Sequence, residues 1–269
     1  MIYPAPACYS ALRDGEVDLV AGSAHLPLTA FPNWHGVRLL CSLSQGMYWF
    51  LVMRKSLGIA AGNMAALSGR RIVAAPGVDL GLKQLLVAAS IDAQAEGIEI
   101  VGLPGGVPKG VSFGVAAARA MVAGDIDGFW ANGMAAEVAV ESGEGAVVLD
   151  ARRGQGPQAA FGFTQPTLAA REPWIQDDPD RAQAVVSAIV NTLRRLRADP
   201  GLATLVGQAR FPPEEASLIE RLVRRDLDHY RPVLSDAFIR SMQAFSSALG
   251  LIDEPRPFDE VVASVGRSL

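Results

Sequence analysis

The sequence has little of what metal centres and disulfide frameworks are made from. It contains two cysteines and three histidines in 269 residues. Cys8 and Cys41 cannot build a disulfide scaffold or a four-thiolate zinc site, so they form one disulfide or none. The histidines, His25, His35 and His229, are scattered without the spacing of metal ligands. We therefore expect no metal and no cofactor.

Positive charge and long apolar runs are also scarce. The chain has three lysines, a formal net charge of −4 and a sequence pI near 5.5. Nucleic-acid binders neutralise phosphates with clustered Lys and Arg, so we exclude that class. No apolar run reaches the length of about 18 residues that a bilayer span needs, so we expect no membrane insertion. Residues 1–10 (MIYPAPACYS) have neither the basic nor the apolar stretch of a secretory signal.

What the chain does have is the pattern of an α/β protein. Half of its residues are hydrophobic and 19% are charged, which is typical of a folded chain with a substantial core. From Arg13 to about Gln165, short β-branched runs alternate with helical patterns, which predicts mainly parallel sheets. The predicted strands are 17–20, 37–43, 48–53, 71–74, 98–101, 126–130, 147–149 and 160–164. After Gln165 the pattern becomes helical to the end.

One internal similarity recurs at an offset of 109 residues. Residues 11–18 read ALRDGEVD and residues 120–127 read AMVAGDID. Each stretch predicts a helix that Gly15 or Gly124 stops, followed at once by a strand with Asp18 or Asp127 at its start. The shared position of both copies at a helix-to-strand step favours a duplicated lobe over chance.

Several segments together resemble the substrate-binding proteins of nitrate, sulfonate and taurine type ABC transporters, a group that includes thiamine-precursor (pyrimidine) binding proteins. The segments are SALRDGEVDLVAGSA (10–24), GMYWFLVMRKSLGIAAGNMAALSGRRIVAAPGVDLGLKQLL (46–86), RAMVAGDIDGFWANGMAAEVA (119–139) and FGFTQPTLAAREPWIQDDPDRAQAVVSAIVNTLRRL (161–196). ALSGRRIVAAPG is the most specific piece. The resemblance covers residues 9–200, and the helical tail adds nothing specific.

The resemblance implies a two-lobed α/β fold of the periplasmic-binding-protein type II class, with the ligand in a cleft between the lobes. Lobe one would be residues 1–54 plus 166–269, and lobe two residues 55–165. It implies a solute-binding, non-enzymatic component of an ABC importer, located in the periplasm or outside the cytoplasm, with a small-molecule ligand and with permease and ATPase subunits as partners. The family has a leader and a further strand and helix ahead of the segment that matches Tyr9, and here eight residues precede it.

The ends of strands and the starts of helices supply the predicted ligand site, because backbone N–H groups and helix dipoles converge there. These positions are Gly22 and Ser23 after the first strand, Tyr48 and Trp49 at the third, Gly77, Val78 and Asp79 at a helix start, and Trp130 and Asn132 after a lobe-two strand. Trp49 and Trp130 are predicted to stack on a flat ligand, while Phe50 and Phe129 are predicted to lie in the core.

Asp79 bears on the class of ligand. Its carboxylate would occupy the positive end of a helix, where a nitrate or sulfonate would otherwise bind, or would simply cap that helix. We therefore favour an aromatic or heterocyclic compound resembling a thiamine pyrimidine, with sulfonate, taurine or nitrate as the alternative. Asn132 and Ser23 suit polar groups on such a compound. His25 and His35 are assigned to the surface or to capping.

Two other functions remain open on the same fold. The fold is shared with a thiamine-pyrimidine synthase and with enzymes of menaquinone biosynthesis, but the sequence has no nucleophile turn, no Cys-rich metal motif and no nearby Ser–His or Cys–His pairing. It is also shared with effector domains of transcriptional regulators, which follow a helix-turn-helix segment that is not found here.

Overall fold

The computed structural model describes residues 2–267 and 269, apart from the side chain of residue 214. The chain divides into two units. Unit 1 contains Met1–Met47, Gly162–Asp199 and Asp226–Leu269, and unit 2 contains Tyr48–Phe161 and Pro200–Arg225. None of the helices in the described part of the chain is both long enough and apolar enough to cross a membrane.

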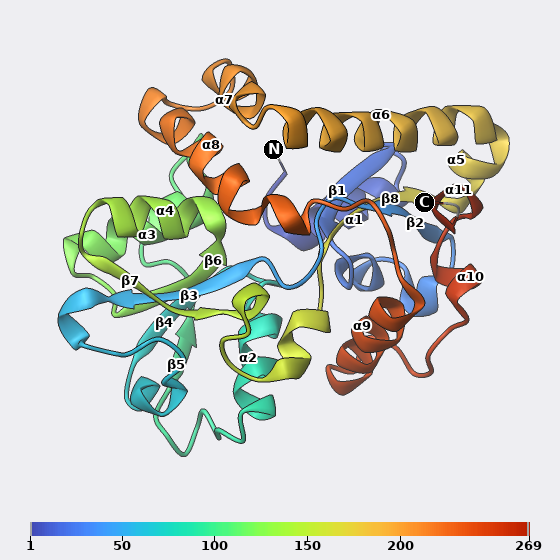
Figure 1. Cartoon of the computed structure of the whole chain (residues 1–269). Coiled ribbons are helices and arrows are strands. Elements are labelled where there is room, and N and C mark those ends of the chain that lie inside the picture. The colour runs from blue at the N-terminus through green and yellow to red at the C-terminus, as the bar shows by residue number, and fades with distance from the viewer. Residues whose placement is uncertain (1, 268) are drawn as a thin grey trace. The chain divides into compact units, whose positions relative to one another are not determined.

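Unit 1 is built on a small sheet in the strand order β1-β8-β2 (Figure 1). Its strands are β1 (Leu19–Ser23), β2 (Val37–Ser42) and β8 (Pro166–Arg171), and its helices are α1 (Ala5–Arg13), α5 (Glu172–Asp177), α6 (Pro179–Ala198), α9 (Asp236–Ala248), α10 (Phe258–Val261) and α11 (Ser264–Arg267). β8 lies between β1 and β2 and runs antiparallel to both. Apolar clusters pack on the sheet, one of them around Tyr9, Trp34 and Leu39.

Unit 2 contains a larger mixed sheet in the strand order β5-β4-β6-β3-β7. Its strands are β3 (Trp49–Arg54), β4 (Arg71–Ala74), β5 (Glu99–Val101), β6 (Gly128–Asn132) and β7 (Gly145–Asp150), and its helices are α2 (Asp79–Ala88), α3 (Phe113–Ala123), α4 (Gly133–Glu141), α7 (Gly201–Gln208) and α8 (Pro213–Asp226), whose last residue is assigned to unit 1. β3 runs antiparallel to β6 and β7, whereas β4 runs parallel to β5 and β6.

The core of unit 2 explains why small residues dominate α3 and α4. Phe50 and Phe129 are buried in it, as expected, together with alanines from both helices such as Ala117 and Ala135. Alanine lets the two helices pack closely on each other and on the sheet, and Figure 1 shows them side by side next to β6 and β7.

The structure confirms the internal similarity. Gly15 and Gly124 have φ of 78° and 88°, the left-handed region that glycine tolerates best. Each helix end is closed by the same two hydrogen bonds, Gly15 N to Leu12 O (3.2 Å) and Glu16 N to Ala11 O (2.9 Å). In the second copy they run from Gly124 N to Met121 O (3.0 Å) and from Asp125 N to Ala120 O (3.0 Å), at the same offset of 109. Both ends are therefore Schellman motifs that turn the chain directly into a strand.

The α/β prediction holds, but three parts of the pattern were wrong. The sheets are not mainly parallel: the sheet of unit 1 is antiparallel, because β8 runs against both of its neighbours, and the sheet of unit 2 is mixed, because β3 runs against β6 and β7. Residues 160–164 are not a strand; a 3-10 helix at Gln158–Gly162 occupies most of that stretch. The strand comes later, as β8 (Pro166–Arg171), in the region predicted to be purely helical. Its small, weakly alternating residues are buried on both faces, so no period of two is visible.

The unit boundaries also differ from the predicted lobes at 54 and 165. Tyr48–Arg54 belongs to unit 2, because β3 is a central strand of its sheet. Pro200–Arg225 belongs there too, because α8 is tied to α4: Arg221 and Arg225 both pair with Glu137, at 2.9 and 2.5 Å, and Arg221 also pairs with Glu141 at 2.8 Å. Arg221 and Arg225 are four residues apart on α8, and Glu137 and Glu141 are four residues apart on α4, so the two helix faces can pair. The sequence-based assignment of the whole tail to lobe one missed this pairing.

Candidate functional site

Predicted site residues of unit 2 meet at one edge of its sheet. Trp49, the first residue of β3, is the register partner of Asn132, the last residue of β6. On the other side of β6, Trp130 is the register partner of Ala74, which ends β4. The segment that follows β4 leads into α2, so the helix start predicted to face the ligand begins at this same edge.

The two tryptophans lie together and are buried. Their ring centroids are 6.1 Å apart in an edge-to-face arrangement, and Tyr48, which is half-buried, lies 5.2 Å from Trp49. Trp130 has no exposed surface and Trp49 is 2% exposed. The indole Nε1 of Trp130 donates a hydrogen bond to the carbonyl of Val78 (3.1 Å). Trp130 therefore fixes the start of α2, and the predicted stacking of either ring on a ligand stays a prediction.

The start of α2 already uses its N–H groups within the chain. Gly77 N donates to the Asp79 carboxylate (2.9 Å), and the N–H groups of Val78 and Asp79 both donate to Ala75 O (3.0 and 2.9 Å). The other carboxylate oxygen of Asp79 pairs with Lys83 Nζ at 2.5 Å. The negative charge that the helix dipole favours at this end is thus supplied by Asp79 itself.

Asn132 is the exposed polar group of this edge. Its Oδ1 accepts from Ala135 N (3.3 Å), which makes Asn132 the N-cap of α4. The side-chain amide Nδ2 makes no hydrogen bond to any residue that the structure describes. An exposed N–H donor therefore lies at the end of β6, opposite Trp49 on the neighbouring strand β3.

Gly22 and Ser23 lie in unit 1, at the end of β1. A side chain at Gly22 would meet the hydroxyl of Tyr9, at 2.6 Å from an added Cβ. That hydroxyl donates to the carbonyl of Ser23 (3.3 Å), and Thr167 Oγ1 donates to the carbonyl of Gly22 (3.4 Å). The glycine is therefore required by the packing of a buried tyrosine, and Ser23 is itself 2% exposed.

Sequence reasoning missed a buried polar network beside these two residues. Gln165 accepts from Gly46 N (3.3 Å) and donates to Ser42 Oγ (3.1 Å), and Ser42 in turn donates to Ser44 O (2.9 Å). Gln165 O also accepts from Ala24 N (3.0 Å). The network joins the ends of β1 and β2 to the start of β8. The sequence feature that pointed to this network was a pair of polar residues, Thr164 and Gln165, between the apolar Phe163 and Pro166.

His25 corrects another prediction. Of the two predicted roles, surface or capping, the surface role is wrong, because His25 is fully buried. His25 does stand at the N-cap of the 3-10 helix Leu26–Thr29, but its side chain makes no capping hydrogen bond there. Its Nδ1 lies 3.1 Å from Thr164 Oγ1, and its ring contacts Phe245 edge-on at 5.2 Å. His35 is exposed, as predicted.

Burial disfavours the nucleophilic thiolate form of both cysteines. Burial raises the pKa of Cys41 to about 12, and burial also raises that of Cys8, so both thiols are protonated at neutral pH. Both cysteines are free. Within residues 2–267 and 269, no three His, Cys, Asp or Glu side chains gather in a way that could hold a metal ion.

Comparisons with known proteins show the fold. No protein-family model matches the sequence, and no sequence of a curated protein matches it. Among solved structures, the chain is similar to the alkanesulfonate-binding protein SsuA from Xanthomonas axonopodis pv. citri bound to MOPS, with 16% identity and a TM-score of 0.68 over 97% of this chain and 84% of that one. It is also similar to the ligand-binding component of an ABC-type import system from Staphylococcus aureus with zinc bound, with 13% identity and a TM-score of 0.70 over 97% and 83%.

An enzyme has a similar fold. A mutant of the desulfurization enzyme DSZB in complex with biphenyl-2-sulfinic acid matches with 18% identity and a TM-score of 0.62, over 91% of this chain and 82% of that one. The mixed α/β architecture of the chain is therefore that of periplasmic binding proteins, a fold that serves both binding and catalysis.

Proposed function

We propose that the chain is the solute-binding component of an ABC importer, which captures a small organic ligand outside the cytoplasm and delivers it to the membrane permease, with ATPase subunits completing the importer. The fold similarity to SsuA and to a staphylococcal import component supports this role. The polar and aromatic residues gathered at the sheet edge of unit 2 support a ligand site there, at the place where binding proteins with this kind of sheet hold ligands.

Our inference about the ligand class rests on the start of α2, where the backbone N–H groups are already hydrogen-bonded within the chain. This holds for the N–H groups of Gly77, Val78 and Asp79. In addition, the carboxylate of Asp79 lies where a bound oxyanion would need hydrogen-bond donors. A small anion such as nitrate would meet repulsion at this helix start. We infer an aromatic or heterocyclic ligand that takes a hydrogen bond from Asn132 Nδ2 and lies near Tyr48 and Trp49.

Two alternatives have specific support. The similarity to SsuA bound to MOPS supports a sulfonate as ligand, with taurine and nitrate in the same group. The similarity to DSZB supports an enzyme on this fold, although the raised pKa values of Cys8 and Cys41 disfavour the thiolate form that such chemistry would use. The buried pair of His25 and Thr164 would then be the place to look for a general acid or base.

The test is a thermal-shift screen of the purified chain against pyrimidines, aromatic acids, aryl and alkyl sulfonates, taurine and nitrate. A ligand present at about 100 times its Kd stabilises the folded state by about 2.7 kcal/mol, which the unfolding temperature reports clearly. We expect a shift with an aromatic or heterocyclic compound. A shift with nitrate or taurine alone would overturn the ligand class while leaving the binding role.

Catalysis is tested in the same screen. Each compound is incubated with the chain and analysed by mass spectrometry, and a binding protein returns it unchanged. Turnover of any compound would replace the binding role with the enzyme alternative. No shift with any compound in the panel would count against the proposal.

A further inference from the structure

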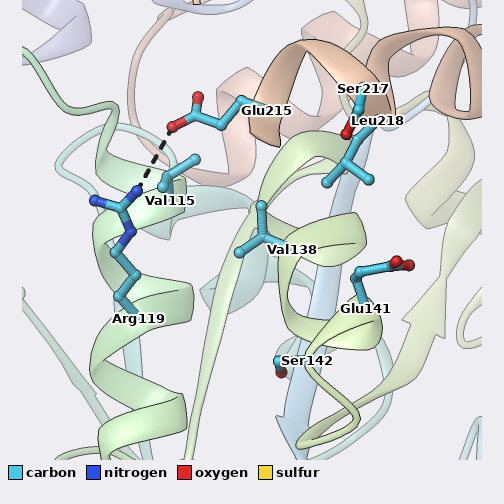
Figure 2. Close-up of a pocket in the computed structure, with 8 residues that line it drawn as sticks. All are labelled: Val115, Arg119, Val138, Glu141, Ser142, Glu215, Ser217 and Leu218. Atoms are coloured by element: carbon cyan, nitrogen blue, oxygen red, sulfur yellow. Dashed lines mark ion pairs between the residues drawn. The ribbon is translucent and has the colours of Figure 1, made fainter. Parts of the chain in front are cut away.

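Unit 2 contains a cavity that none of the predicted site residues lines. It has a volume of about 370 Å³ and lies between α3, α4 and α8 (Figure 2). Its lining residues are Val115, Arg119, Val138, Glu141, Ser142, Glu215, Ser217 and Leu218. A volume of this size is within the range of about 300–1,000 Å³ of small-molecule sites.

The interior surface of the cavity is aliphatic. Val115, Val138 and Leu218 come from three different helices, and Figure 2 shows their side chains directed toward the space between those helices. Val115 and Leu218 are 1% and 8% exposed. A short apolar group placed among them would be removed from water on three sides, which is a favourable contact for any hydrocarbon body.

Glu215 supplies the charge of the cavity. Its side chain is 8% exposed, and its charged partner, Arg119, lies 3.9 Å away. No hydrogen bond reaches the Glu215 carboxylate from any residue that the structure describes. Glu141, the second carboxylate of the lining, has Arg221 at 2.8 Å. A buried carboxylate is costly without hydrogen-bond donors, so Glu215 is the group that would gain most from a ligand.

The balance of charge and exposure selects the kind of ligand. Glu141 is paired with Arg221, which leaves Glu215 and Arg119 as the facing charges among the described lining residues. The Arg119 side chain is 53% exposed, so it can leave Glu215 for solvent at little cost. An ammonium group could then donate short hydrogen bonds to Glu215, while its hydrocarbon part covers the three aliphatic side chains.

We propose that this cavity binds a small organic cation, an ammonium group that carries a short apolar body. The site goes beyond the importer function, because none of the residues assigned to that function lines it. The ammonium takes the place of Arg119 beside Glu215, and Val115, Val138 and Leu218 hold the hydrocarbon.

The test uses hexylammonium, with hexanol and hexanoate as neutral and anionic counterparts. The chain is labelled at Val and Leu methyl groups and titrated by NMR. We expect hexylammonium to shift the methyl signals of Val115, Val138 and Leu218, and hexanol and hexanoate to bind at least tenfold more weakly. Equal binding of hexanol, or shifts spread over other methyl groups only, would overturn the proposal.

Three variants separate the cation site from simple hydrophobic binding. Glu215→Gln is expected to weaken hexylammonium binding at least tenfold, and Glu96→Gln, the same charge change at an exposed position of unit 2, to leave it unchanged. Arg119→Gln is expected to strengthen binding, because the ligand no longer displaces a competing cation. Weaker binding in Arg119→Gln, or unchanged binding in a folded Glu215→Gln, would contradict the site. The methyl spectrum of each variant reports its folding directly.

Discussion

Arg54 and Asp127 form an ion pair, with Arg54 Nη2 and Asp127 Oδ1 2.8 Å apart, that joins the end of β3 to the start of β6. The second carboxylate oxygen of Asp127 accepts from Arg71 N (3.0 Å), at the start of β4. The same relationship recurs in unit 1, where Arg171 at the end of β8 lies 3.9 Å from Asp18. The internal similarity therefore includes an aspartate at the helix-to-strand step and an arginine on the neighbouring antiparallel strand.

The two copies of this pair are expected to differ in strength. Asp127 is 21% exposed and hydrogen-bonded twice, whereas Asp18 is 65% exposed with one long contact. Asp127→Ala should lower the free energy of unfolding by about 1.5–3 kcal/mol, because it removes two charge-assisted hydrogen bonds. Asp18→Ala should cost less than about 1 kcal/mol, the usual value of an exposed pair. Urea denaturation of both variants checks this, and equal losses would contradict it.

The contribution of Asp127 should also depend on pH. Burial alone would raise its pKa, but hydrogen bonds from Arg71 N and Arg54, with the charges of Arg54 and Arg70, lower the pKa below its ordinary value. A lowered folded-state pKa means that the stabilisation is complete above the unfolded value of about 3.9 and is lost as the pH falls through the folded value. The stability gap between the wild type and Asp127→Ala should be constant near neutral pH and shrink below about pH 4. If the stability difference between the wild type and Asp127→Ala grows in acid, then the pKa of Asp127 is raised in the folded state and not lowered.

Part of the fold could be predicted because local signals determine it. The helix ends at Gly15 and Gly124 are set by left-handed glycines, which the sequence displays openly. β8 could not be predicted, since it is buried between β1 and β2 and shows no alternation of polar and apolar residues. The placement of α8 in unit 2 depends on pairing between Arg221 and Glu137, residues 84 positions apart, which no local pattern reveals.

The site was predictable to the extent that strand ends determine it. The sequence placed Trp49, Trp130 and Asn132 at strand ends, and the register of β3 and β6 brings them together. The burial of Trp130 and the hydrogen bond from its indole to Val78 depend on tertiary packing. His25 was misassigned for the same reason, because its partner Thr164 is 139 residues away.

Gly128, the first residue of β6, should tolerate no side chain. An added Cβ would collide with Val52 O and Met53 Sδ and would lie 3.1 Å from Met53 Cα. Gly128→Ala is expected to cost about 1–3 kcal/mol of unfolding free energy, because the backbone of β3 cannot move away without breaking its pairing. Gly102→Ala is the matched control, since nothing lies within 4 Å of its added Cβ. Similar stability of the two variants in urea would mean that β3 and β6 are farther apart than described.

The two cysteines should react at very different rates. Cys41 is fully buried and its pKa is raised to about 12, while Cys8 is half-buried with a smaller rise in pKa. Because the thiolate is the reactive form, a disulfide reagent at neutral pH should label Cys8 slowly and Cys41 only after unfolding. Ellman's reagent gives the count of reactive thiols with and without guanidinium chloride. Cys8→Ser should leave none in the folded chain, and rapid reaction of that variant would contradict the burial of Cys41.

Asn132 allows its structural and ligand-binding roles to be separated. Its Oδ1 caps α4 through Ala135 N, and its Nδ2 is the exposed donor assigned to the ligand. Asn132→Ser keeps a capping oxygen and removes the amide donor, whereas Asn132→Ala removes both. Asn132→Ala should lose about 1 kcal/mol of stability and Asn132→Ser only a few tenths, as measured by urea denaturation.

Binding of the compound found in the thermal-shift screen should fall by a similar factor in Asn132→Ser and Asn132→Ala, about fivefold or more for one lost hydrogen bond of about 1 kcal/mol. This equality is the critical result, because a purely structural role would make the loss of affinity follow the loss of stability. If Asn132→Ser binds as tightly as the wild type, then the Nδ2 donor has no part in recognition, and the ligand site of unit 2 must be sought at Tyr48 and Trp49 instead.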